Sequence, residues 1–105
     1  MMWYPQEAAF RAGAVNDREW DPGNIGYGSA AFGSGTSASG PYGFAAGQAS
    51  AASGPFATAL GLHTLASGYA ATAMGQDTTA SALASTAIGQ STMASGAQSL
   101  SLIHI

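Results

Sequence analysis

The sequence predicts an all-β chain folded as a parallel β-roll, a solenoid of fourteen-residue coils. Glycine recurs at every seventh residue from Gly26 to Gly96, except that Ala82 stands in one of these places. Alanine stands five residues after each of these marks, and the next residue alternates between an apolar side chain and serine. This alternation doubles the period, so one repeat consists of two unlike halves of seven residues each.

A period of seven is also typical of coiled coils, but these residues argue against a helix. Heptads need large apolar side chains at two positions, whereas one fixed position here is glycine, which costs about 1 kcal/mol in a helix. Short strands fit better, with each glycine and the two residues after it forming a corner. The predicted turn glycines are Gly33, Gly40, Gly47, Gly54, Gly61, Gly68, Gly75, Gly89 and Gly96.

The third and fifth residues after each glycine share one face of a strand, because side chains alternate faces. They are small throughout, as in Thr78 and Ala80. We expect this face to be the interior, since Leu or Phe would hold the two strands apart. Coils stack about 4.8 Å apart, so about five coils give a rod roughly 25 Å long. This thin interior buries little apolar area, and one chain alone is expected to be marginally stable.

The outward positions differ between the two half-repeats. One half carries apolar side chains that stack into a ladder, and the other carries mostly serine. A continuous exposed apolar stripe is typical of an interface, so we predict that the ladder faces partner chains in a homotrimer and that the serine side faces water. The predicted interface residues are Phe32, Leu60, Met74 and Ile88.

Composition divides the chain near Gly23, because every charged residue except Asp77 lies before residue 22. We expect residues 1–25 to be a cap or lead-in segment and residues 26–99 to be the β-roll repeats. Residues 100–105, LSLIHI, are what the DNA string CTGTCTCTTATACACATC would encode. That string resembles a sequencing-library adapter, so we expect this tail to be non-native. The lead-in also carries an aromatic group, expected to be part of the cap: Trp3, Tyr4, Phe10 and Trp20.

The repeats resemble the head-domain repeats of trimeric autotransporter adhesins over residues 26–96, most clearly in STAIGQSTMASG. In that family each chain forms a left-handed parallel β-roll, and three rolls pack around an axis. The resemblance implies an adhesive or structural segment of a trimeric fibre on a bacterial surface, binding host extracellular-matrix or cell-surface receptors. It implies an outer-membrane anchor, expected outside this chain. Similar rolls occur in phage tail fibres and in bacterial fibre proteins with a self-cleaving chaperone domain, so a rigid tail-fibre spacer on a virion is the alternative.

The remaining chemistry predicts no enzyme, no cofactor and no metal site. A formal charge of −3 gives no basic patch for nucleic acid, and there is no cysteine to hold a metal. His63 and Asp77 occupy the same turn position one coil apart, so we expect them to stack about one strand spacing apart. Two ligands without a third do not make a metal site, and a solvated surface pair is expected.

Two other classes of protein fit the sequence less well than a fibre does. An ice-binding solenoid would present a flat threonine ladder, but the Leu, Met and Ile on the same face disfavour an ice plane. A disordered Gly/Ala/Ser spacer is disfavoured because a flexible linker has no reason to keep register. The threonines that an ice-binding face would use are Thr58, Thr72, Thr79 and Thr86.

Overall fold

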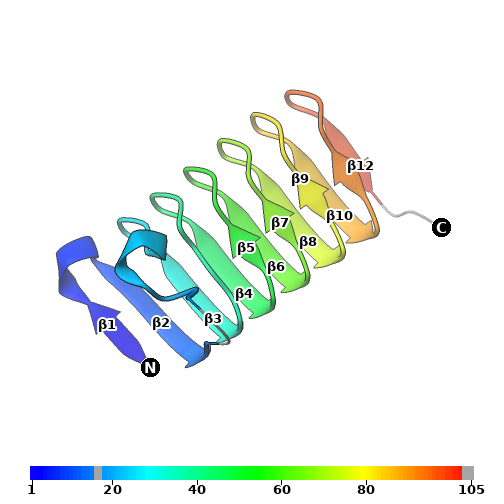
Figure 1. Cartoon of the computed structure of the whole chain (residues 1–105). Coiled ribbons are helices and arrows are strands. Elements are labelled where there is room, and N and C mark those ends of the chain that lie inside the picture. The colour runs from blue at the N-terminus through cyan, green and yellow to red at the C-terminus, as the bar shows by residue number, and fades with distance from the viewer. Residues whose placement is uncertain (16–17, 103–105) are drawn as a thin grey trace.

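The computed structural model describes residues 1–15 and 18–102, and it is an all-β solenoid with two sheets (Figure 1). Each coil contributes a long strand to one sheet and a short strand to the other. The long sheet contains β1 (Met2–Tyr4), β2 (Ala9–Ala14), β3 (Ala30–Ser34), β4 (Phe44–Gln48), β6 (Thr58–Leu62), β8 (Thr72–Gln76), β10 (Thr86–Gln90) and β12 (Leu100–Leu102). The short sheet contains β5 (Ala51–Ala52), β7 (Leu65–Ala66), β9 (Thr79–Ala80) and β11 (Met93–Ala94). The 3-10 helices η1 (Pro5–Glu7) and η2 (Pro22–Asn24) lie in the N-terminal segment.

The register between coils is constant and equals the predicted repeat. Ala45 of β4 pairs in parallel with Ala59 of β6, which pairs with Ala73 of β8, so each step along the long sheet is one full repeat. The short sheet follows the same step, from Ala52 to Ala66. Because the register never shifts, equivalent residues of successive coils stack in columns along the rod.

The space between the two sheets is filled by the small side chains, as expected. Ala59 from the long sheet and Ala66 from the short sheet are fully buried, and so is Thr78 in the turn that follows β8. Small side chains let the sheets approach closely, and the chain measures 39 × 22 × 15 Å. The rod is longer than the stack of coils expected from the sequence, because β1, β2 and β12 extend the long sheet at its two ends (Figure 1).

Both rows of turn glycines are required by the close approach of neighbouring coils. A Cβ atom on Gly61 would lie 2.0 Å from the carbonyl oxygen of Gly75, and one on Gly54 would lie 2.2 Å from that of Gly68. Gly61 also has a φ of 126°, within β6. The left-handed residue of each corner is the second after the glycine, as at His63, whose φ is 54°.

The corner at Ala82 keeps its shape but changes one hydrogen bond. The N–H of Gly68 donates to the carbonyl of Ala80 in the next coil at 3.3 Å, whereas the N–H of Ala82 donates to Ser85 Oγ in its own turn at 3.2 Å. The Ser85 hydroxyl in turn donates to the carbonyl of Ala82 at 2.8 Å. The serine therefore provides, within the turn, a partner for the N–H at the one corner that lacks glycine.

The N-terminal segment closes one end of the roll. Phe10 of β2 pairs in parallel with Ala30 of β3, a longer step than the repeat, because an inserted segment loops out before Ile25. Strand β1 then pairs antiparallel with β2, so the long sheet ends on a reversed strand. Strand β12 continues the repeat register at the other end, with Leu100 opposite Thr86. Asp17 and residues 103–105 of the predicted tail lie outside the described residues.

Candidate functional site

The outward side of the long sheet is a continuous apolar surface, here called the apolar face. It consists of two side-chain columns that alternate with the buried alanines along each strand. The first column contains Phe10, Ala30, Phe44, Thr58, Thr72, Thr86 and Leu100. The second column contains Ala12, Phe32, Ala46, Leu60, Met74, Ile88 and Leu102. Both columns are therefore uncharged throughout, and apart from three threonines their side chains are apolar.

The structure places the four predicted interface residues together in the second column. Leu60 pairs with Met74 and Met74 with Ile88 in direct register, and each is partly exposed in the single chain. Phe32 lies nearer the N-terminal end, where its ring centroid is 5.5 Å from that of Phe10 and 5.7 Å from that of Phe44. The apolar face is thus rich in aromatic rings at one end and aliphatic along the rest.

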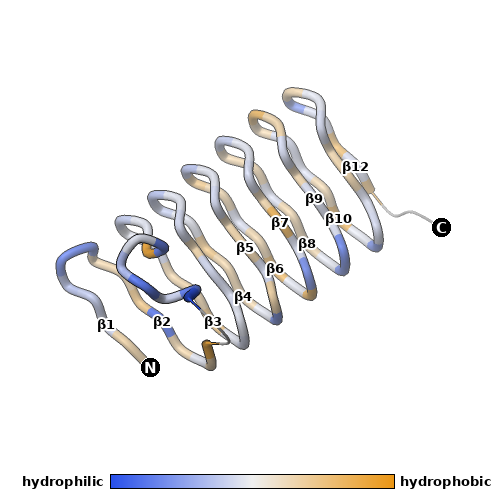
Figure 2. The backbone as a smooth tube through the Cα atoms, viewed as in Figure 1, coloured by the Kyte–Doolittle hydropathy of each residue, from blue (hydrophilic) through white to orange (hydrophobic). Residues whose placement is uncertain are grey.

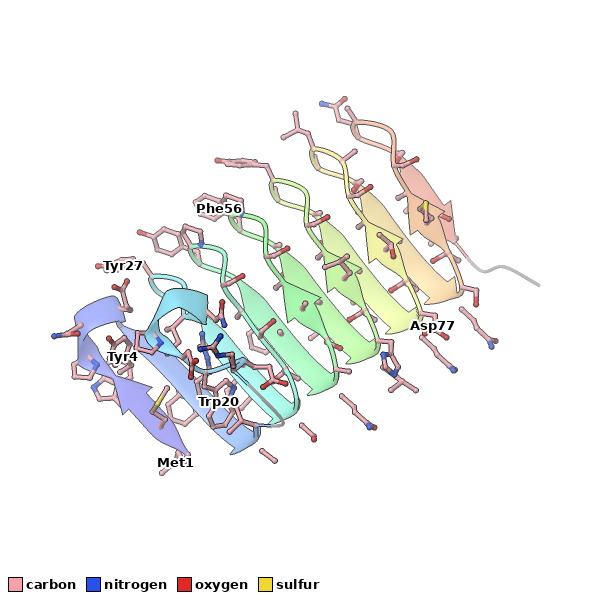
Figure 3. All side chains as sticks on the ribbon, in the orientation of Figure 1. Met1, Tyr4, Trp20, Tyr27, Phe56 and Asp77 are labelled. Atoms are coloured by element: carbon pink, nitrogen blue, oxygen red, sulfur yellow. The ribbon has the colours of Figure 1, made fainter. Side chains whose placement is uncertain are left out.

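An aromatic row along one edge of the rod was missed by the reasoning from sequence. We call this row, Tyr27, Tyr42, Phe56 and Tyr69, the aromatic edge; it lies at the corners that precede the long strands β3, β4, β6 and β8 (Figure 3). Successive ring centroids are 5.7, 5.1 and 5.6 Å apart, and about half of each side chain is exposed. The available signal was an aromatic residue one or two places after every second turn glycine.

The opposite edge of the long sheet is polar, and we call it the glutamine edge. Its column follows the last residue of each long strand, and His63 and Asp77 lie just beyond it at corner positions (Figure 3). Histidine and aspartate are among the residues that tolerate a left-handed backbone best, which accounts for their presence there. No hydrogen bond or ion pair joins their side chains. The column of the glutamine edge is Ser34, Gln48, Leu62, Gln76 and Gln90.

The outward side of the short sheet is the polar surface expected from the serines. Its serine column is interrupted neither by a charge nor by a large side chain, although Leu65 and Met93 in the neighbouring column are exposed. Within the described residues, no group of three His, Cys, Asp or Glu side chains is placed to hold a metal ion. The serine column is Ser39, Ser53, Ser67, Ser81 and Ser95.

A buried guanidinium lies at the N-terminal end of the interior. Arg11 pairs in register with Ala31, so its side chain enters the column that alanine fills in the following coils, and it is fully buried. It donates hydrogen bonds to the carbonyl of Ala38 at 3.1 Å and to Ser29 Oγ at 2.9 Å. Burial lowers the pKa of Arg11, but a guanidinium remains charged at neutral pH.

Above this end of the short sheet the N-terminal segment forms a small polar cleft. Its volume is about 290 Å³, and its lining includes Arg18, Glu19 and Asn24 from the segment and Ser37 and Ser39 from the first coil. Trp20 donates from its indole nitrogen to the carbonyl of Thr36 at 3.2 Å, which fastens the segment to the roll. Hydrophilic residues concentrate in this region and at the turns beyond β8 and β10 (Figure 2).

Within the described residues no helix has the length and hydrophobicity that a membrane span requires.

Comparison with known families matches the repeats directly. The family model described as the YadA head domain repeat (2 copies) matches residues 25–48, 38–64, 66–92 and 83–102. The matched segments together cover the whole solenoid from Ile25 to Leu102 apart from Leu65. The comparison with curated proteins found no match, and the comparison with solved structures found none either.

Proposed function

The chain belongs to the family of YadA head domain repeats, and from this premise we propose that it is an adhesive head segment of a trimeric surface fibre. The family implies an adhesin-type surface segment of a bacterium that assembles as a homotrimer, and it is not a known enzyme family. In the proposed assembly three left-handed rolls lie parallel to one axis. The rigid rod then presents its outer surface to host matrix or cell-surface molecules.

The observation that carries the proposal is the difference between the two faces. The apolar face runs the length of the long sheet without a charge, whereas serines line the exposed side of the short sheet. Burying apolar area is worth about 25 cal/mol per Å², and the alanine-filled interior of a single chain provides little of it. We therefore propose that Phe32, Leu60, Met74 and Ile88 meet the other two chains at the axis, where their burial supplies the missing stability.

The test is the native mass of the full chain, measured by native mass spectrometry or sedimentation, for the wild type and for Leu60→Asp. We expect the wild type to be a trimer. Leu60→Asp should dissociate it, because three carboxylates would be buried near one another at the axis.

Ser67→Asp is the matched control, since Ser67 also directly precedes a turn glycine but lies exposed on the short sheet. It introduces the same charge and should leave the trimer intact. A wild-type chain that is a folded monomer would contradict the proposal, and so would loss of the trimer in Ser67→Asp alone.

A further inference from the structure

The aromatic edge and the glutamine edge match one another row by row. Tyr42 precedes β4 and Gln48 ends it, so a phenol stands at one edge of this row and an amide at the other. Phe56 precedes β6, and this row ends on Leu62. The ring that lacks a hydroxyl is thus opposite the one residue of the glutamine edge that cannot form a side-chain hydrogen bond.

The neighbouring rows follow the same rule. Tyr69 precedes β8, which ends on Gln76, and Tyr27 precedes β3, which ends on Ser34. The row of β10 departs from it, because Leu83 stands at the aromatic edge and Gln90 at the other. Four consecutive rows therefore pair a phenol with a polar side chain, or a plain ring with an aliphatic one.

This match cannot act within one chain. The two edges are separated by a five-residue strand such as β8, which at about 3.3 Å per residue is on the order of 16 Å. In a cyclic trimer, however, each interface joins two different patches. If three sheets face one axis, the aromatic edge of each chain lies beside the glutamine edge of the next. Rotation about the axis keeps height, so each row meets the same row of its neighbour.

We infer that the aromatic edge of each chain packs against the glutamine edge of the neighbouring copy, row against row, and so sets the relative height of the three chains. This inference rests on the proposed trimer and adds a second contact to it. The rings bury their faces, and each phenol gains the amide partner that a tyrosine hydroxyl needs when it leaves water. A shift by one coil would place Phe56 against a glutamine and a tyrosine against Leu62, leaving polar groups without partners, which is costly.

The first experiment uses cysteine pairs, because the chain has no cysteine of its own. Ala70→Cys and Asp77→Cys lie at the exposed corners that flank the β8 row, and they are too far apart for a disulfide within one chain. We expect oxidation, or a short bismaleimide, to give covalent trimers on a denaturing gel. In the control pair, Ala70→Cys with Ser81→Cys, the second thiol is on the exposed short sheet and should give no trimers.

Native mass, measured on the same samples, separates the possible outcomes. Covalent trimers from the first pair alone support the inference. A native trimer without them, or equal cross-linking of the control pair, overturns the edge contact and leaves the proposed trimer standing. A monomer overturns the proposed function and the edge contact together.

An exchange at the β6 row tests the row matching separately. Phe56→Tyr and Leu62→Gln should each lower the temperature at which the trimer dissociates, because each leaves a polar group facing an apolar one. The double variant converts this row into a copy of the β8 row, and it should recover most of the loss. Additive losses would overturn the row matching.

Discussion

At the scale of single residues, the turn glycines are fixed by the backbone of the next coil as well as by the bend itself. The position of Gly61 is doubly restrictive, because its φ is 126° and a side chain would collide with Gly75. Gly61→Ala should therefore lower the free energy of unfolding by on the order of 3 kcal/mol. Urea unfolding followed by circular dichroism measures this loss. Gly23→Ala is the control, since a Cβ atom there has no heavy atom within 4 Å, and it should change little.

A second prediction concerns the buried hydroxyl groups. Thr78 Oγ1 is buried without a hydrogen-bond partner, whereas Ser50 Oγ donates to the carbonyl of Gly61 at 2.8 Å. Thr78→Val keeps the shape and removes the unpaired group, so it should raise the free energy of unfolding by about 1 kcal/mol. Ser50→Ala breaks a bond and should lower it by about as much. Equal effects of both variants would show that Thr78 has a partner in solution.

At the scale of elements, Arg11 ties β2 to the first coil. Its guanidinium fills the end of the alanine column and bonds to Ser29 and Ala38, which lie on two sides of the roll. Arg11→Ala leaves a cavity and unpaired polar groups, so we expect a loss of about 3 kcal/mol at this end. In a solenoid each coil contacts only its neighbours. Amide hydrogen exchange should therefore accelerate over residues 26–38 and stay unchanged over residues 79–94. Uniform acceleration along the rod would contradict this local role.

At the scale of the whole molecule, the proposed assembly is held by uncharged surfaces. The outward columns of the apolar face carry no charged side chain, and the same is true of the aromatic edge and the column of the glutamine edge. Screening by salt weakens interactions between charges but leaves apolar burial in place, so the native mass should stay that of a trimer when the ionic strength is raised to about 0.5 M. Dissociation by salt alone would point to an interface elsewhere, at the charged N-terminal segment.

The sequence by itself determined the solenoid, its fourteen-residue coil, the alanine interior and the apolar column of Leu60, Met74 and Ile88. This was possible because a constant coil length turns a period in sequence directly into a register in space. Only the tertiary structure placed Arg11 in the interior, since the inserted segment breaks the period before β3. Only the structure brought Tyr42 and its neighbours into one row, because the direction of a corner side chain depends on a left-handed backbone that the period does not encode. The match between the two edges likewise became visible only when each long strand placed its two ends at one height.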